Sequence, residues 1–417
     1  MKRSRPAIGR RPHALAQTAD VSDATHSQRP AVAIAIAAGV VGAFYIAKLP
    51  AALPALKSEL GLSLVDAGWA VSAFNILALV AAPLFGLAAD RTGALRFVLG
   101  GLVLMIVGAL VAVTGADPRT LVASRIIEGA GFIATAIAAP ALITVAAAPA
   151  HRKLALGVWS AYMPLGGSLT MFAAPFVIAA GGWRALWLIV AGLTALCALA
   201  LLAMRSHFRG AGPRAPRPFR AALRPFGSPA VRWLGLAFAF YTAQFMTMLV
   251  WLPTFLVARG VSLPVASALT AGYVTSNVPG NLLGAWLLQR GATRGGLIAG
   301  ASLLMGAFGV AAFVTALPDT ARYVAVLGLS LVGGIIPAAV LSASHVHART
   351  ASEIGSVQSL FVQGSNLGQF VGPPAVAGLV AATGEWSMAV VVLGAAAALG
   401  SVAGLRVAHH ERTLAKP

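Results

Sequence analysis

The stretch Gly86-Leu87-Ala88-Ala89-Asp90-Arg91-Thr92-Gly93-Ala94-Leu95-Arg96 has a counterpart later in the chain. Its spacing of glycine, glycine and arginine returns at Gly284, Gly291 and Arg294, each 198 residues further on. The same offset relates three more pairs, which are Gly157 and Gly355, Gly166 and Gly364, and Pro175 and Pro373. A repeat of this length predicts two structurally related halves.

The composition predicts that lipid surrounds most of the chain. Of its 417 residues, 59% are hydrophobic and 10% are charged, and the mean hydropathy is +0.85. A water-soluble domain of this composition would expose an aggregating surface. The net charge of +19 lies in short basic segments between apolar runs, which is typical of membrane topology signals and argues against nucleic acid as a partner. Cys197 is the single cysteine, so an intramolecular disulfide and a cysteine-based metal site are excluded.

The apolar runs have the length of membrane spans. A bilayer core about 30 Å thick needs about twenty apolar residues of helix. We therefore expect an all-α integral membrane protein with twelve transmembrane helices, whose partner is the lipid bilayer. The predicted spans are 31–55, 67–89, 97–114, 120–146, 155–180, 184–204, 231–257, 264–288, 295–317, 321–344, 354–381 and 386–406.

Basic residues indicate the orientation of these spans. Most of the 30 Lys and Arg residues fall in the two tails and in every second loop. The opposite loops carry only Lys57, Arg119, Arg184, Arg259 and Arg322. Because basic loops stay on the cytoplasmic side, we expect both termini in the cytoplasm of a bacterium and a multi-pass protein of its inner membrane.

The repeat and the basic segments also predict the domain organisation. Two pseudo-symmetric six-helix bundles, joined by a linker rich in Arg, Pro and Gly, would place a solute site at their interface near the midplane. We expect the protein to function as a monomer. The predicted parts are a disordered basic cytoplasmic tail at 1–30, the first bundle at 31–204, a cytoplasmic linker at 205–230, the second bundle at 231–406 and a cytoplasmic tail at 407–417.

The loop that ends in Arg96 resembles the G-x-x-x-D-R-x-G-[basic] loop of the major facilitator superfamily. Its parts would form a cytoplasmic gating loop made of Gly86, Asp90, Arg91, Gly93 and Arg96. Gly86 permits close helix approach, Asp90 can receive a base or a helix N-terminus, and Gly93 turns the chain. This sequence departs from the family pattern because Arg96 follows two residues later than the usual last base.

Two further segments bear on the resemblance. Arg125-Ile126-Ile127-Glu128-Gly129-Ala130-Gly131 resembles the family's R-x-x-[Gln/Glu]-G-x-G segment, in which the arginine is associated with ion coupling or substrate charge. The fifth predicted span departs from the pattern of drug exporters and looks more like the cyanate/nitroimidazole-type small-anion branch. The resemblance covers residues 31–406 and implies the major facilitator fold, with two bundles that rock about a central site.

Polar residues within the spans indicate which helices line a pathway. The interiors of the third, sixth, ninth and twelfth spans carry no charge or amide, so we expect these spans to face lipid. The candidate substrate and ion pathway residues are Lys48, Asn75, Arg125, Glu128, Tyr162, Gln244, Asn277, Asn281, Gln363 and Asn366. The alternatives are that Lys48 reaches the membrane boundary, that Arg125 and Glu128 form a structural pair, and that the amides bind neighbouring helices.

The charged candidates favour transport of an anion or a proton. Counting residues along the helices places Lys48 and Arg125 at a similar depth, with Glu128 one turn deeper. The three side chains together carry a net formal charge of +1, which would attract an anion, while Glu128 could exchange a proton.

These features predict a secondary active transporter, not an enzyme, for a small organic solute. An anion is favoured, and alternating access coupled to protons is the expected mechanism. We expect no cofactor or metal, and because no G-x-x-x-x-G-K-[ST] motif is present, a proton or other ion gradient would drive transport. The alternatives are a drug/proton antiporter and, from another class, a polytopic membrane enzyme. The enzyme would need clustered ligands or a nucleophile beside Glu128.

Overall fold

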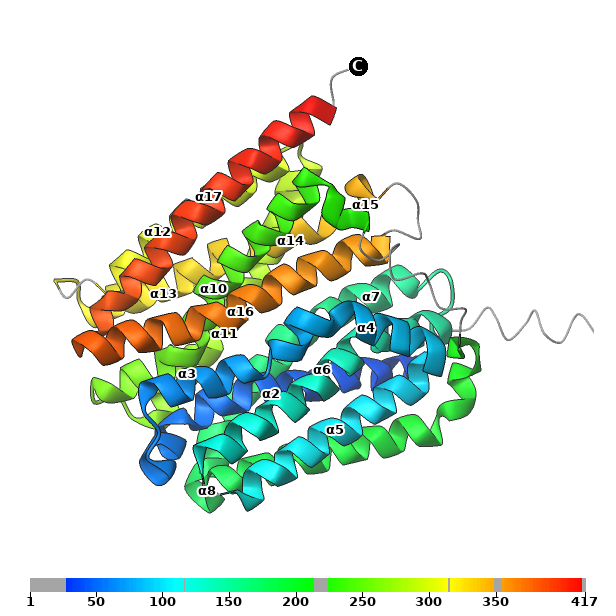
Figure 1. Ribbon diagram of the computed structural model, residues 1–417, viewed down its shortest axis with the longest axis horizontal. Helices are drawn as coiled ribbons and strands as arrows, with labels where there is room; N and C mark the ends of the chain where they lie inside the picture. The colour runs from blue at the N-terminus through cyan, green and yellow to red at the C-terminus, as the bar shows by residue number, and fades with distance from the viewer. Residues whose placement is uncertain (1–27, 116, 214–223, 314–315, 349–353, 415–417) are drawn as a thin grey trace, which may run out of the picture.

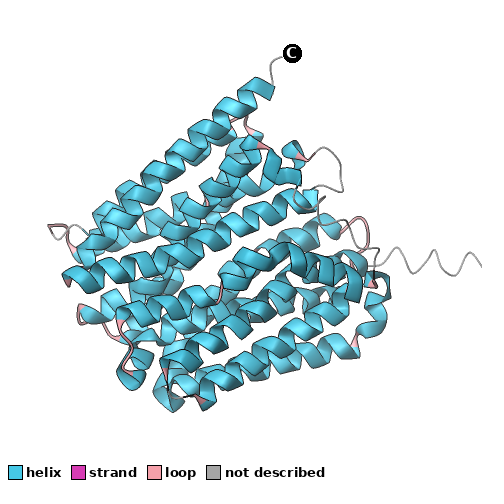
Figure 2. Cartoon of the chain, viewed as in Figure 1, coloured by secondary structure: helices cyan, strands magenta, loops and turns pink. Residues whose placement is uncertain are grey.

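The computed structural model describes residues 28–115, 117–213, 224–313, 316–348 and 354–414, and in these ranges it contains helices and no strand (Figure 2). Helix is expected because lipid offers no hydrogen-bond partner to the backbone. The helices are α2 Arg29–Leu60, α3 Leu64–Ala73, α4 Ile76–Thr92, α5 Ala94–Thr114, α6 Pro118–Ala146, α7 Arg152–Ser160, α8 Tyr162–Ala203, α10 Pro229–Ala258, α11 Leu263–Gln289, α12 Arg294–Phe313, α13 Asp319–Gly333, α14 Ile335–Ser342, α15 Ser344–His347, α16 Ile354–Thr383 and α17 Ala389–Leu414. Short 3₁₀ turns are η2 Arg205–Ala211, η3 Arg224–Gly227 and η5 Trp386–Met388.

The helices are consistent with the twelve predicted spans. Within the described ranges, nine helical stretches are long and apolar enough to cross a membrane. One of them, α8, is interrupted at Gly181 and Gly182, where Gly182 has a φ of 72°, so it provides two spans. The long helices α11 and α16 carry more polar side chains and complete the set.

Three spans are broken in their interior. A turn at Ala161 separates α7 from α8, and the next turn contains Pro164, which has no backbone N–H to donate. A second break separates α3 from α4 at Phe74 and Asn75, and a third separates α13 from α14 at Gly334.

Figure 1 shows two helical halves, one formed by α2 to α8 and the other by α10 to α17. Helices α2, α3, α4 and α8 of the first half contact α10, α16 and α11 of the second. The helices predicted to face lipid, which are α5, the last part of α8, α12 and α17, present exposed apolar side chains such as Val103, Leu196, Leu303 and Leu405.

The repeat is visible in the backbone. Gly93 and Gly291, which are 198 residues apart, both adopt positive φ, at 85° and 89°. Each follows the last turn of one helix and precedes another, which is the position where glycine is favoured because it lacks a Cβ.

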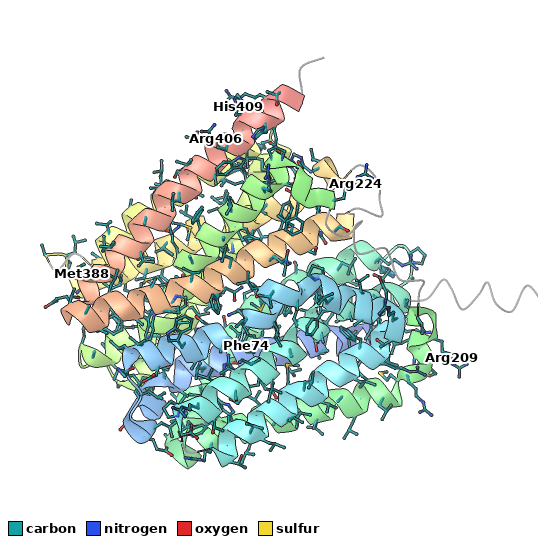
Figure 3. All side chains as sticks on the ribbon, in the orientation of Figure 1. Phe74, Arg209, Arg224, Met388, Arg406 and His409 are labelled. Atoms are coloured by element: carbon teal, nitrogen blue, oxygen red, sulfur yellow. The ribbon has the colours of Figure 1, made fainter. Side chains whose placement is uncertain are left out.

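The tails differ in part from the predicted boundaries. Helix α17 continues to Leu414, so the C-terminal tail predicted to begin at residue 407 starts inside a helix. Most of the N-terminal tail and the centre of the linker lie outside the described residues, and those predictions remain predictions. Figure 3 shows Arg209, Arg224, Arg406 and His409 toward one end of the helices and Met388 at the other, as the basic bias requires.

Candidate substrate and ion pathway

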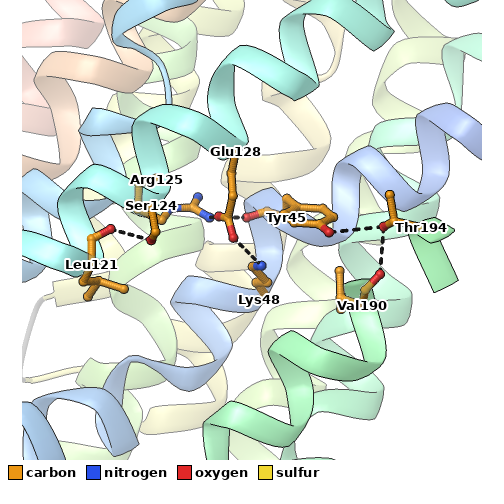
Figure 4. A network of polar contacts seen from close by, with 8 residues as sticks. All are labelled: Tyr45, Lys48, Leu121, Ser124, Arg125, Glu128, Val190 and Thr194. Carbon is orange, nitrogen blue, oxygen red and sulfur yellow. Dashed lines mark hydrogen bonds and ion pairs between the residues drawn. The ribbon is translucent and has the colours of Figure 1, made fainter. Parts of the chain in front are cut away.

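The three charged candidates meet in the interior of the first half (Figure 4). Lys48 Nζ in α2 donates to Glu128 Oε1 in α6 over 2.7 Å, and Arg125 Nη1 pairs with the other carboxylate oxygen, Oε2. Arg125 Nη1 also donates to the backbone oxygen of Tyr45 at 2.8 Å. The side chains of Lys48 and Glu128 are 0% exposed. The predicted common depth of Lys48 and Arg125 is therefore matched by a shared counter-ion, and we call these three residues the charged triad.

Aromatic rings enclose the triad. Lys48 Nζ lies 3.9 Å from the ring centroid of Tyr45 and 4.5 Å from that of Trp187, and Arg125 Cζ lies 4.4 Å from that of Phe74. The hydroxyl of Thr194 donates to that of Tyr45 at 3.3 Å. Helix α8, which carries Trp187 and Thr194, therefore also holds Tyr45 of α2 in place. Cation–π contacts are strongest where water is excluded, so these rings stabilise the buried charges.

These enclosing residues were not predicted from the sequence. Tyr45 could have been found because it precedes Lys48 by three residues and so shares its helix face. Trp187 and Thr194 belong to the last part of α8, a span that was predicted to face lipid because it has no charge. One face of that span does face lipid, while the other packs against the charged triad.

The alternative in which Lys48 reaches the membrane boundary is wrong, because its side chain is fully buried and bound to Glu128. Arg125 and Glu128 do form a pair, as the structural alternative held, but that pair extends to a second cation. Burial of ions is costly and is compensated only when the partners are well placed. The net charge of +1 predicted for this site is retained inside the first half.

The second half lacks the triad. At the offset of 198 residues, Lys48, Arg125 and Glu128 correspond to Met246, Tyr323 and Val326. Tyr323 makes a different contact from that of Arg125: its hydroxyl donates to Leu269 O in α11 over 2.8 Å, whereas Arg125 binds α2, the helix that corresponds to α10. The second half thus has no charged triad at these offset positions.

Two amides form a separate cluster in the second half. Asn277 Nδ2 donates to Tyr241 Oη at 3.1 Å and to Ser330 O at 2.9 Å, which connects α11 to α10 and α13. Asn281 Nδ2 donates to Asn277 Oδ1 at 2.9 Å. Asn277 therefore binds neighbouring helices, as the alternative role of the amides predicted. These bonds form a polar cluster in the second half, whereas the charged triad lies in the first.

The remaining pathway candidates are dispersed. Gln363 Nε2 in α16 donates across the two halves to Leu79 O at 3.3 Å. Gln244 and Asn366 donate to carbonyls of their own helices, and Asn75 is buried at the break between α3 and α4. Tyr162 stacks on Trp159 with ring centroids 4.5 Å apart. Of this group, only Gln363 makes a described hydrogen bond between the halves.

The predicted gating loop joins α4 to α5. A Cβ at Gly93 would lie 3.1 Å from the backbone of Gly212, while Gly86 has open space beside it among the described atoms. Asp90, Arg91 and Arg96 make no ion pair with any described residue. The repeat partner of Arg96 is different, because Arg294 Nη1 pairs with Glu411 Oε1 at 2.6 Å.

At the opposite end, the halves are joined by a hydrogen bond that depends on proline. Ser72 Oγ in α3 donates to Phe370 O in α16 over 2.6 Å. In a regular helix that carbonyl would accept from the residue four positions later, but this residue is Pro374, which has no N–H. The freed carbonyl therefore accepts from the other half. The ring of Trp69 packs on Phe370 beside it, with centroids 5.9 Å apart.

We expect Ser72→Ala to weaken closure at this end. Loss of one buried hydrogen bond should shift the population toward separated halves by about fivefold. Spin labels at Val65→Cys and Thr383→Cys, in a Cys197→Ser background, would report the distance between α3 and α16. Ser401→Ala is the control, because its hydroxyl bonds only within the second half, to Ala299 O and Ala397 O. An unchanged distance distribution in Ser72→Ala would contradict the prediction.

Comparisons with known proteins agree with the fold. The sequence matches the profile of the Major Facilitator Superfamily over residues 32–373. The "Probable sulfoacetate transporter SauU" of Cupriavidus necator is 26% identical over 85% of this chain and 87% of its own length. The "Putative niacin/nicotinamide transporter NiaP" of Bacillus subtilis is 24% identical over 63% and 67%. The "3-(3-hydroxy-phenyl)propionate transporter" of Escherichia coli is 30% identical over about half of each chain, 49% and 51%.

Solved structures support the same fold at low sequence identity. A bacterial homolog of the human lysosomal transporter Spinster, in an inward-facing and occupied conformation, has a TM-score of 0.74 at 17% identity. The match covers 92% of this chain and 96% of that one.

Proposed function

The chain belongs to the major facilitator superfamily, and on that premise we propose that it is a proton-coupled secondary active transporter that moves a small organic anion by alternating access. It is a multi-pass membrane transport protein and not an enzyme. The observation that carries the proposal is the charged triad, which is fully buried, has a net charge of +1 and occurs in one half only. Charged side chains inside a membrane protein are costly and commonly mark function.

In the proposed mechanism, Glu128 is an internal counter-ion whose negative charge is neutralised when it binds a proton. While its carboxylate is charged, it occupies both Lys48 and Arg125. When Glu128 takes up a proton, the two cations lose their partner, and a carboxylate or sulfonate of the solute can replace it. Release of the proton restores the internal pairs and expels the solute. Proton and anion would therefore move in the same direction.

The two ends of the molecule fit one state of an alternating-access cycle. The halves are joined at the end where Ser72 meets Phe370. With both termini in the cytoplasm and the protein in a bacterial inner membrane, which we also propose, this state is the one open to the cytoplasm. A monomer contains both halves and is sufficient.

The relatives support an anionic solute, since sulfoacetate and 3-(3-hydroxyphenyl)propionate, which are named for two of them, are organic anions. A ligand screen by thermal shift tests the proposal and does not require the substrate to be known. A ligand at one hundred times its Kd adds about 2.7 kcal/mol of stability. We expect small carboxylates or sulfonates to raise the Tm of the purified protein, and cationic drugs to leave it unchanged.

A matched pair of variants makes the screen specific. Arg125→Gln should remove the shift. Arg322→Gln should keep it, because Arg322 is also buried but binds Ala312 O and Asp319 in the second half. A shift caused only by cationic drugs would favour the drug/proton antiporter instead, and an anion shift that survives Arg125→Gln would remove Arg125 from the site.

A further inference from the structure

A recess of about 320 Å³ opens between α3 and α6, near the points where both helices begin, and its lining includes none of the three triad residues. The front of Figure 1 shows these two helices side by side. The residues around it are Asp66, Trp69, Pro118, Arg119, Val122, Ala123 and Ile126. Its lining combines two opposite charges with apolar side chains, which is the pattern of a site for an amphiphile.

The rim carries both charges in a form that can bind a ligand. Asp66 Oδ2 accepts from Ser63 Oγ at 2.6 Å and from Ser63 N at 3.1 Å, which completes the cap of α3. Its second oxygen, Oδ1, and the guanidinium of Arg119 have no hydrogen-bond or ion-pair partner among the described residues. Both side chains are exposed. The rim therefore offers a free acceptor at Asp66 and a cationic donor at Arg119, which interacts electrostatically with the exposed carboxylate of Asp117.

The walls become apolar with depth. Val122 and Ile126 follow Arg119 by three and seven positions and so lie on the same face of α6, one and two turns further in. Across the recess Trp69, which is 49% exposed, lies one turn below Asp66. Tryptophan is favoured where headgroups meet the hydrocarbon core. Since α3 and α6 both begin at this end of the molecule, the two charges lie at headgroup level and the apolar walls at acyl-chain level.

The second half has no equivalent of this recess chemistry. At the offset of 198 residues, Asp66, Trp69 and Arg119 correspond to Pro264, Ser267 and Leu317. The charges and the indole are therefore properties of one half and not of the fold.

We propose that this recess binds one zwitterionic phospholipid with a primary ammonium headgroup, as in phosphatidylethanolamine. Arg119 binds the phosphate, Asp66 Oδ1 accepts from the ammonium, and an acyl chain lies along Trp69, Val122 and Ile126. Arginine suits a phosphate because its planar guanidinium can donate two parallel hydrogen bonds. A choline headgroup has no N–H to donate to Asp66, and the negative charge of an anionic headgroup is repelled by that carboxylate. The site is thus selective by headgroup, which goes beyond the proposed transport function.

Lipid retention by the full-length protein tests this inference. Protein would be reconstituted in nanodiscs of phosphatidylcholine with equal small fractions of phosphatidylethanolamine and phosphatidylglycerol, then released into detergent for native mass spectrometry. We expect one phosphatidylethanolamine to be retained in preference to the other two lipids. Arg119→Gln and Asp66→Asn should each reduce that retention by about tenfold, because each removes a charge-assisted hydrogen bond. Asparagine at 66 can still accept from Ser63 and keep the cap.

The control is Arg290→Gln. Arg290 is an exposed arginine stacked on an exposed tryptophan, with Cζ 4.5 Å from the ring centroid of Trp286, but it follows the last turn of α11 and does not line the recess. It should retain the lipid as the unchanged protein does. Equal retention of all three lipids would overturn the proposal, and so would undiminished retention in Asp66→Asn. Stronger retention of phosphatidylglycerol in Asp66→Asn, without loss of phosphatidylethanolamine, would also overturn it, because Arg119 would then act alone.

Discussion

Glu128→Gln is expected to abolish accumulation of the solute driven by a pH gradient while leaving solute exchange in place. Glutamine can still accept hydrogen bonds from Lys48 and Arg125, but it can neither carry the charge nor bind and release the proton. The site is then held in the form that resembles proton-loaded Glu128. The cations stay available to the anion, so exchange of labelled for unlabelled solute continues across the liposome membrane.

The measurement is the ratio of internal to external solute with and without an imposed pH gradient. In the unchanged protein the gradient should raise this ratio well above one, and in Glu128→Gln the ratio should settle at about one, since uncoupled transport only equilibrates the solute. Only monodisperse protein would be reconstituted, so that a folding defect is not counted as loss of coupling.

Two further variants make the result interpretable. Glu128→Asp retains a carboxylate on a shorter side chain, and we expect it to accumulate solute at a reduced rate. Glu59→Gln is the control for loss of an ion pair in the same half, because Glu59 binds Arg184 and Trp183 at the surface and not in the triad. Gradient-driven accumulation by Glu128→Gln would show that another group carries the proton.

The sequence was sufficient to predict most of the fold and to select the three charged residues that meet in the candidate site. Apolar runs of membrane length and the offset of 198 residues predicted the two helical halves. Lys48, Arg125 and Glu128 were identified because charges inside apolar runs are rare and must find partners. Their mutual contacts follow from depth along the helices, which residue counting provides.

What the sequence could not provide was the direction in which uncharged side chains point. Trp187 lies in an apolar run whose two faces look alike by composition, so nothing marked it as a wall of the triad. Asn366 and Gln244 were expected in the pathway because they are amides, yet each amide donates to a carbonyl of its own helix. That choice depends on the rotamer and on the neighbouring helix, and neither is encoded in residue type.

The breaks within the spans show the same limit. The break at Ala161 lies beside Pro164, and proline removes a hydrogen bond at a known position. The break at Phe74 and Asn75 has no such residue. It falls where Gly129 of α6 allows close approach, since a Cβ there would lie 1.9 Å from Phe74 O. This break therefore accompanies a close contact between two helices, which no residue type near Phe74 indicates in the sequence.

Lys48→Met, added to Glu128→Gln, is expected to restore stability but not transport. Glu128→Gln alone leaves two buried cations without a counter-ion, which should cost about 3–5 kcal/mol. Removing Lys48 as well returns the site to its native net charge of +1, and methionine is the residue that the second half has at this position. We expect the double variant to recover at least half of the lost stability, measured by thermal unfolding in the same detergent.

Unlike Glu128→Gln, the double variant should neither exchange nor accumulate solute, because one of the two cations is gone. A double variant that is stable and still transports would mean that the triad only holds α2 against α6. A stable but inactive one would separate the function of these charges from their role in the fold.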